Sequence, residues 1–291
     1  MSRIKTNIDT IYNSNAKKDI TIVHISDIHF NTNTSFKTLN RISRYINNLN
    51  ADYVMITGDT LDDPAIVRDD VKIKELVVFL TNIAKNSKVF ISLGNHDIVY
   101  NNGYVFFNKL NDLYNIYVLN NKSYEDEFVY IAGFTLPTEY YYNINMAESV
   151  EVLLDYLTEQ DKIVSKLPSK KIKIALIHSP IRLTNKEVLT KLHEYDIILT
   201  GHTHGGMVPN ILKFLFKDNY GFVGPTKRFF PMVAKGKYED EINNKKITII
   251  INEAITKLSL KAGKIFSIFN IFWRISINKI IIEKRKRYIS K

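Results

Sequence analysis

The feature that most constrains the fold of this chain is a set of polar clusters, each placed directly after a run of apolar residues. Such apolar runs are typical of buried strands, so each cluster is expected to begin where a strand ends. Together the clusters hold five of the seven histidines of the chain. Nitrogen and oxygen atoms delivered from several strand ends to one place are the ligands that a two-metal hydrolytic centre needs. The clusters are Asp27-Ile28-His29, Gly58-Asp59, Gly94-Asn95-His96-Asp97, His178 and Gly201-His202-Thr203-His204.

Apolar runs rich in Ile and Val alternate with stretches of helical periodicity, which predicts a layered α/β fold. We expect the first strand at 20–26 and further strands at 53–57, 89–93, 171–177, 196–200, 246–252 and 275–283. Residues 115–134 predict two strands around a turn at 120–126, and helices are expected at 35–49, 67–85, 146–167 and 185–194. No stretch has the composition of a linker, so we predict one domain at 20–291 after a polar segment at 1–19, with an irregular aromatic and basic segment at 207–238.

The composition excludes several kinds of site. The chain has no cysteine, which rules out disulfides, thiolate zinc sites and cysteine nucleophiles. No apolar run approaches the ~20 residues that span a bilayer, and residues 1–19 lack the apolar stretch of a secretion signal, so we expect a soluble, cytoplasmic protein. The net charge of +10 favours anionic partners such as phosphates, nucleic acid or acidic lipid headgroups, although lysines on solvated helix faces explain it equally well.

The spacing within the clusters favours shared ligand sites. Residues two apart in an extended segment point to the same side, so Asp27 and His29 can face one ion, and His202 and His204 have the same spacing. Glycines at the strand exits, such as Gly58, let the backbone turn tightly and approach closely. We therefore expect four strand ends of one sheet edge to converge, at the edge where open α/β sheets bind ligands.

The clusters resemble the motifs of the calcineurin-like metallophosphoesterases, which read D-x-H, G-D, G-N-H-D/E, H and G-H-x-H in this order. The resemblance covers about residues 20–206, and five ordered motifs are far more specific than any one of them. It implies a layered α-β-β-α sandwich, with two mixed sheets flanked by helices and a metal site at the C-terminal ends of the strands. The run from Gly201 to Gly206 also resembles a bacterial branch that includes YkuE-like membrane-associated phosphohydrolases and enzymes acting on UDP-diacylglucosamine.

The resemblance implies two divalent metal ions, with three ligands for each ion and one carboxylate that bridges both. The ligands are Asp27, His29 and His204 for one ion, Asn95, His178 and His202 for the other, and Asp59 as the bridge. A ligand set of imidazole, carboxylate and amide without sulfur suits Mn, Fe or Zn. Catalysis would proceed by attack of a metal-bridging hydroxide on phosphorus, with His96 at the leaving-group oxygen. Asp97 is a candidate for orienting the His96 ring.

Simpler interpretations stay open for residues in and near the motifs. Asn95 and Asp97 could instead cap the helix that follows them. Four further residues are expected to have no part in the chemistry, either as turn residues before a proline or as ordinary hydrogen-bonded histidines. They are Asp62 and Asp63, and His24 and His193.

Three classes of function remain. The first is hydrolysis of a small, lipid-linked or nucleotide-sugar phosphoester or pyrophosphate. The second is a nuclease or phosphodiesterase acting on nucleic acid, which the charge of +10 makes plausible. The third is a non-catalytic scaffold, which would have lost ligand residues, whereas none is missing here. Aromatic residues in 207–238, with Phe269 and Trp273 before the basic run 284–287, suit peripheral contact with the inner face of an anionic membrane, or simply core packing.

Overall fold

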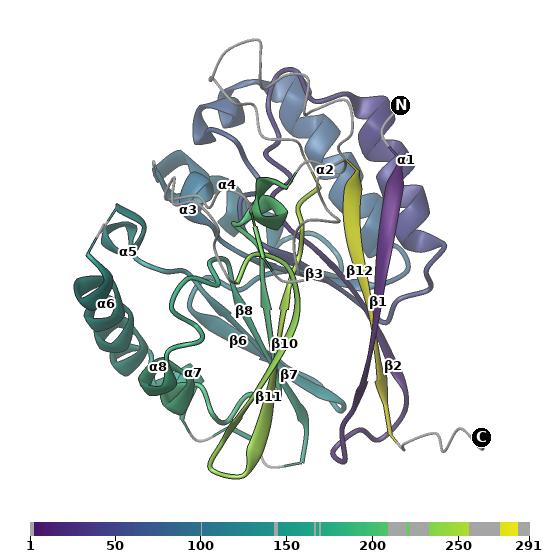
Figure 1. Cartoon of the computed structure of the whole chain (residues 1–291). Coiled ribbons are helices and arrows are strands. Elements are labelled where there is room, and N and C mark those ends of the chain that lie inside the picture. The colour runs from purple at the N-terminus through teal and green to yellow at the C-terminus, as the bar shows by residue number, and fades with distance from the viewer. Residues whose placement is uncertain are drawn as a thin grey trace.

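Two six-stranded mixed β-sheets form the centre of the part of the chain that the structure describes (Figure 1). The computed structural model describes residues 3–99, 101–142, 145–165, 167–168, 170–208, 220–221, 233–255 and 274–284. The strand order of the first sheet is β1 (Ile4–Tyr12), β12 (Ile275–Glu283), β2 (Ile20–Ile25), β3 (Tyr53–Thr57), β4 (Lys88–Ser92) and β5 (Ile116–Val118). That of the second sheet is β10 (Gly236–Ile242), β11 (Lys245–Ile251), β9 (Ile197–Thr200), β8 (Ile172–Ile177), β7 (Val129–Phe134) and β6 (Lys122–Glu125).

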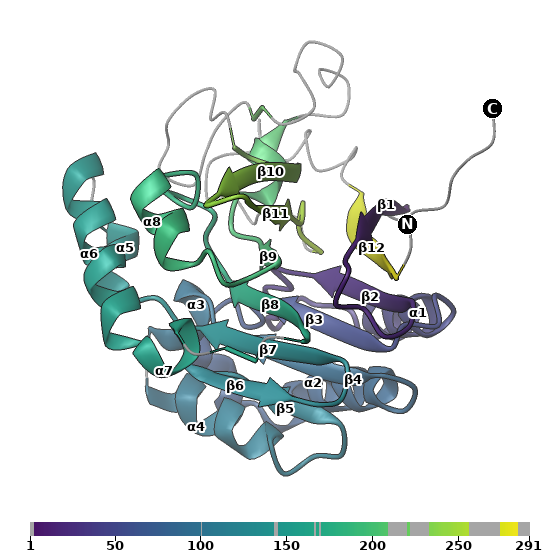
Figure 2. The ribbon, with the colours of Figure 1, turned by 90° about the horizontal axis from the view of Figure 1, so that it is seen from below.

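Helices cover the outer face of each sheet, so the layers run helix, sheet, sheet, helix (Figure 2). Helices α1, α2 and α4 pack on the first sheet, and α5 to α8 pack on the second. The helices are α1 (Phe36–Asn47), α2 (Asp70–Ala84), α3 (Asn95–Ile98), α4 (Asn101–Leu110), α5 (Thr138–Tyr142), α6 (Met146–Glu159), α7 (Asp161–Val164) and α8 (Lys186–Lys191), with 3-10 turns at Pro64–Arg68 and His204–Met207.

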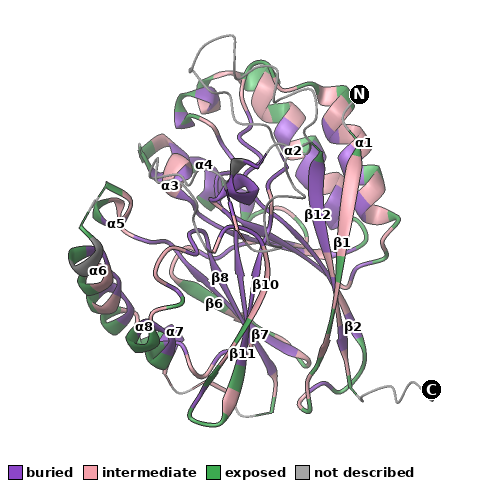
Figure 3. Ribbon diagram, in the orientation of Figure 1, coloured by how far each residue is buried: buried purple, intermediate pink, exposed green. Residues whose placement is uncertain are grey.

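The central strands are buried on both faces, which explains their runs of Ile and Val (Figure 3). On β2, Ile20 and Ile22 belong to the core between the sheets, whereas Val23 and Ile25 belong to the core under α1 and α2. The core between the sheets also contains Leu176 from β8, so both sheets contribute to it. This shared core fixes the sheets against each other and thereby fixes the relation of their strand ends.

Local sequence signals explain where the helices over the first sheet form. In α1, Leu39, Ile42 and Ile46 recur at helical spacing and are buried against the sheet. Helix α2 begins at Asp70, because the side chain of Asp69 accepts a hydrogen bond of 3.0 Å from the backbone N–H of Lys72 and so caps the first turn.

The predicted α-β-β-α layering with two mixed sheets is confirmed, and seven of the predicted strand positions correspond to β2, β3, β4, β8, β9, β11 and β12. Three details are wrong. The first strand is β1, inside the polar segment 1–19, and it pairs in parallel with β12. Residues 115–134 form three strands, β5, β6 and β7, and the helix expected at 146–167 is divided at Gln160 into α6 and α7.

The regions that suggested membrane contact fall mostly outside the described residues. Phe269 and Trp273 lie there, as does most of the segment 207–238, whose last residues begin β10. Among the described residues, no helix has both the length and the apolar content needed to cross a bilayer.

Candidate metal centre

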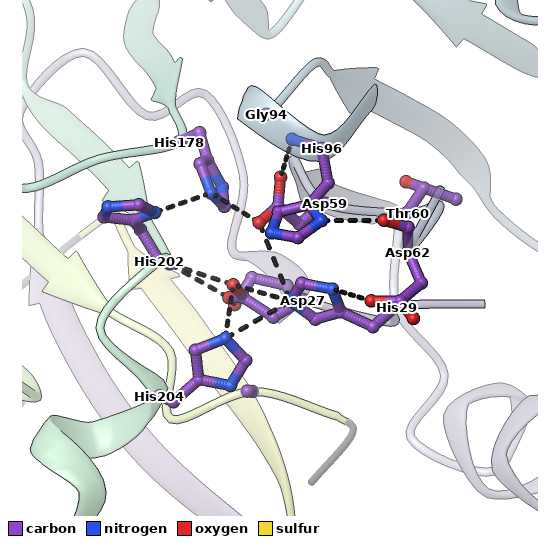
Figure 4. Close-up of polar contacts among 12 residues, drawn as sticks. Asp27, His29, Asp59, Thr60, Asp62, Gly94, His96, His178, His202 and His204 are labelled. Carbon is purple, nitrogen blue, oxygen red and sulfur yellow. Dashed lines mark hydrogen bonds and ion pairs between the residues drawn. The ribbon is translucent and has the colours of Figure 1, made fainter. Parts of the chain in front are cut away.

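The motif residues meet where the C-terminal ends of strands from both sheets come together (Figure 4). The expectation that one sheet edge supplies the site is therefore wrong, because β2, β3 and β4 of the first sheet share it with β8 and β9 of the second. Hydrogen bonds cross between the sheets at this point, and two of them fix motif side chains. His178 Nδ1 donates to the carbonyl of Thr57 at 2.8 Å, and the backbone N–H of His202 donates to Asp27 Oδ2 at 3.0 Å.

Asp27, His29 and His204 form the first group of potential metal ligands. The Nε2 atoms of His29 and His204 lie 3.2 Å apart, and Asp27 Oδ1 lies 3.4 Å from His204 Nε2 and 3.8 Å from His29 Nε2. All three side chains are buried. The hydroxyl of Ser26 donates to Asp27 Oδ2 at 2.5 Å, which holds this carboxylate in place and leaves Oδ1 directed at the histidines.

Asp59, His178 and His202 form the second group. His178 Nε2 lies 3.2 Å from His202 Nδ1 and 3.2 Å from Asp59 Oδ2. Because Nδ1 of His178 donates to a carbonyl, its Nε2 keeps a lone pair for a ligand bond when the ring is neutral. Asn95 begins α3 beside this group, and its buried Oδ1 has no hydrogen-bond partner among the described residues, so this amide oxygen is available to a cation.

Asp59 links the two groups through one oxygen atom. Its Oδ2 lies 3.2 Å from His178 Nε2 and 3.6 Å from His29 Nε2, while its Oδ1 accepts a 2.9 Å hydrogen bond from the backbone N–H of His96. Ligand atoms around one ion with bonds of about 2.1 Å are about 3.0–3.4 Å apart. The observed separations of 3.2 to 3.8 Å within the two groups are close to this spacing, so the residues fit one ion in each group.

Burial and the nearby carboxylates have opposite effects on the pKa values of the four histidines. Burial alone lowers the pKa of His29, but the surrounding carboxylates raise it to about 10, and the same competition raises the pKa of His178 to about 9. Burial lowers the pKa of His202 to about 3 and that of His204 to about 4. Near neutral pH one histidine of each close pair, His29 or His178, therefore carries the extra proton, and its partner is neutral.

Several motif residues have left-handed backbone conformations rather than extended ones. This overturns the expectation that Asp27 and His29, or His202 and His204, alternate as in a strand. Such a conformation costs on the order of 1–3 kcal/mol for a residue with a side chain and is concentrated at functional sites. The residues and their φ angles are Asp27 at 52°, His29 at 43°, Asp59 at 50°, His202 at 68° and His204 at 47°.

Two glycines allow the backbone to come this close. A Cβ added to Gly58, whose φ is 74°, would lie 2.4 Å from His178 Nδ1. A Cβ added to Gly94 would lie 2.2 Å from Asp59 Oδ1. Any larger residue at either position would push a potential ligand out of place.

Asp62 belongs to the site, contrary to the expectation that it only serves a turn. Its Oδ1 lies 3.3 Å from His29 Nδ1, and its backbone carbonyl accepts a 2.7 Å hydrogen bond from His96 Nδ1. The rings of His29 and His96 are neighbours, with centroids 4.7 Å apart. The signal available in the sequence was a carboxylate three residues after Asp59, in the same strand exit.

Asp97 caps the start of α3 instead of orienting His96. Its carboxylate accepts hydrogen bonds from the backbone N–H groups of Gly94 at 2.9 Å and Leu61 at 2.8 Å. The Nδ1 atom of His96, which Asp97 was expected to hold, is bonded to Asp62. The capping alternative therefore describes Asp97, which ties the exit of β3 to the exit of β4.

The two histidines outside the motifs are hydrogen-bonded, as expected. His24 is buried on β2, and its Nε2 lies 2.8 Å from the hydroxyl of Thr57. His193 is bonded to the carbonyl of Thr190 at 2.7 Å.

Comparison with known proteins identifies a match over the whole range of the motifs. Residues 20–206 match the family described as calcineurin-like phosphoesterase. An uncharacterized metallophosphoesterase of Campylobacter jejuni is 30% identical over 213 residues, which cover 72% of this chain and 50% of that protein. One from Helicobacter pylori strain J99 is 27% identical over 208 residues, with 72% and 50% covered. The chain thus spans about half the length of these curated relatives.

The solved structures that match this chain share little sequence with it. A dimetal phosphatase from Danio rerio is 11% identical with a TM-score of 0.42, and the match covers 81% of this chain and 87% of that one. The purple acid phosphatase PPD1 from yellow lupin is 14% identical with a TM-score of 0.41, and the match covers 82% and 45%.

Replacing Asp59 with Asn is expected to remove most bound metal from both sites, because Asp59 Oδ2 is the oxygen that approaches both histidine groups. Metal per chain, measured by inductively coupled plasma mass spectrometry after desalting, should fall from two ions to less than one. Asp63→Asn is a matched control, since the Asp63 side chain caps the 3-10 turn at Ala65 and lies outside both groups. Two ions retained by Asp59→Asn would contradict the bridging position.

Metal binding is expected to release about one proton per ion at pH 7, because a cation must displace the extra proton of His29 in one group and of His178 in the other. Both raised pKa values lie above neutrality, so the apparent affinity should rise with pH, by about tenfold per unit for one proton, until pH approaches 9, where His178 deprotonates without help. Calorimetric titration in buffers of different ionisation enthalpy measures this release. An affinity that stays constant between pH 6 and pH 8 would refute it.

Proposed function

The chain belongs to the calcineurin-like phosphoesterase family, and from this membership we propose that it hydrolyses phosphoester or pyrophosphate bonds with two divalent metal ions. The observation that carries the proposal is the position of Asp59. Its Oδ2 atom lies 3.2 Å from His178 Nε2 in one group and 3.6 Å from His29 Nε2 in the other. When bound, a pair of ions in such a site supplies positive charge for the phosphoryl oxygens and lowers the pKa of water. The residues implied as ligands are Asp27, His29 and His204, then Asn95, His178 and His202, with Asp59 shared.

His96 is the residue proposed to act on the leaving group. The carbonyl of Asp62 can only accept, so His96 Nδ1 carries the proton of their 2.7 Å hydrogen bond. This bond fixes the ring and leaves Nε2 as the atom that can give a proton to a departing oxygen when the ring is charged. The backbone N–H of His96 also donates to Asp59, so the same residue is tied to the carboxylate at the centre of the site.

We propose a phosphorylated small molecule or a lipid-linked or nucleotide-sugar compound as the substrate. The net charge of +10 suits an anionic substrate of this kind. The Gly-His-Thr-His-Gly-Gly run supports this class through its resemblance to enzymes acting on UDP-diacylglucosamine. Nucleic acid is the second candidate, because the same charge favours contact with a phosphate backbone.

A substrate panel tests the proposed function directly. The protein, loaded separately with Mn, Fe or Zn, should hydrolyse bis(p-nitrophenyl) phosphate, and a UDP-linked lipid more efficiently, with loss of activity in chelator. Asp59→Asn should be inactive and Asp63→Asn should keep the wild-type rate. Preferential cleavage of single-stranded DNA with steep salt dependence would favour the nuclease. No hydrolysis of any substrate by the fully loaded protein would contradict the proposal.

Replacing His96 with Ala is expected to lower turnover according to how much the leaving group needs a proton. For an alkyl or phenyl ester we expect a loss of about 10²-fold or more, and for a p-nitrophenyl ester only a small loss, because p-nitrophenolate leaves without protonation. Metal content should stay at the wild-type level. Equal losses for both leaving groups would argue against proton donation by His96.

A further inference from the structure

Helix α5 (Thr138–Tyr142) lies beside the candidate metal centre but holds none of the family motifs. It follows β7 of the second sheet, and it packs against α3, the short helix that begins with Asn95 and His96 (Figure 1). The chain thus places a short run of tyrosines, Tyr140 to Tyr142, next to the helix that holds two implied site residues.

The three tyrosines of α5 have different surroundings. Tyr140 is buried, and its hydroxyl donates to the carbonyl of Ile181 in the loop after His178, which anchors the helix to that loop. Tyr142 is 70% exposed. Tyr141 lies between them in sequence and faces the site, with its ring centroid 5.4 Å from that of His202 and 6.2 Å from that of His178.

The hydroxyl of Tyr141 is a buried donor that the described residues leave unused. The residue as a whole is partly exposed, whereas its hydroxyl oxygen is buried and has no hydrogen-bond partner among the described residues. A buried polar group without a partner costs about 1–3 kcal/mol, so its presence calls for an explanation. Burial and then the charge of Asp59 raise the pKa of this hydroxyl well above its ordinary value.

The chemistry of the site indicates what this donor meets. Asp59 Oδ1 is already occupied by the backbone N–H of His96, and its Oδ2 faces His178 and His29. A phenol near neutral pH is a neutral O–H donor, which can bond an anionic oxygen without competing for the cations. A phosphoryl group held at the metal centre presents several such oxygens.

We propose that Tyr141 binds the substrate, donating a hydrogen bond from its hydroxyl to a phosphoryl oxygen on the side of the centre formed by Asp59, His178 and His202. This inference rests on the proposed phosphohydrolase function. It assigns to α5 a part in recognising the phosphoryl group that the five motifs do not contain. Because the bond is made to the transferred group, it acts on any substrate of the enzyme, whatever lies beyond the phosphate.

Tyr141→Phe in the metal-loaded full chain tests the inference, since it removes one oxygen and keeps the ring against His202. We expect kcat/KM for bis(p-nitrophenyl) phosphate to fall ten- to a hundredfold, as for loss of a hydrogen bond to a charged group. The inhibition constant of inorganic phosphate should rise at least tenfold, while metal content and melting temperature stay at wild-type values. Tyr142→Phe, on the same helix and exposed, is the matched control and should behave as wild type in every measurement.

The outcomes separate this inference from the proposed function. If the wild type hydrolyses the diester and Tyr141→Phe matches it within twofold in both kcat/KM and phosphate inhibition, the role of Tyr141 is overturned and the function stands. If the wild type is inert, calorimetric titration of the manganese-loaded proteins with phosphate decides. Weaker phosphate binding by Tyr141→Phe, with wild-type binding by Tyr142→Phe, supports the inference. Equal binding by Tyr141→Phe and the wild type, or no binding by either, overturns it.

Discussion

The candidate site depends on two carboxylates, Asp27 and Asp59, that are buried at the junction of the two sheets. Buried charges are tolerated only when they are paired and hydrogen-bonded. Around these two acids the fold places four imidazoles in two close pairs, each with ring nitrogens 3.2 Å apart. The carboxylates raise the pKa of His29 to about 10 and that of His178 to about 9, so they stabilise positive charge on these two imidazoles. The two carboxylates also accept hydrogen bonds from the backbone N–H groups of His96 and His202 and from the hydroxyl of Ser26.

The rest of the structure holds these charges at fixed distances. Apolar residues from both sheets fill the layer between them, and the strand exits turn abruptly through left-handed residues that this packing must hold in place. Gly58 and Gly94 let neighbouring exits approach to distances at which a Cβ would collide with a ligand. The left-handed turns and the close glycine contacts therefore have the same cause, which is that several strand ends are crowded into a very small volume.

The sequence was most informative where strands are buried on both faces, because the resulting Ile and Val runs mark β2, β3, β8 and β9 without ambiguity. Ordered motifs then indicated which residues would meet. The polar strand β1 escaped prediction, because its pairing with β12 is a long-range event that local composition does not encode. Three further features could not be predicted from local composition, because they too depend on contacts between distant parts of the chain. They are the division of the site between two sheets, the approach of Asp62 to His29 and the position of Tyr141 beside His202. Asp97 was ambiguous because helix capping and ring orientation require the same residue type in the same place.

The position of β12 between β1 and β2 has a consequence for how the chain is made. Strands β1 and β2 are neighbours in sequence but not in the sheet, because β12 lies between them. A 3.3 Å hydrogen bond between the side chains of Asn7 and Asn278 joins residues that are 271 positions apart in the chain. At about 5–20 residues per second, a ribosome needs roughly 15 to 55 seconds to deliver that segment. During this interval the nascent chain lacks the strand that lies between β1 and β2 in the finished sheet. Strand β1, which pairs with β12 at the edge of the described sheet, can therefore join that sheet only after β12 has been made.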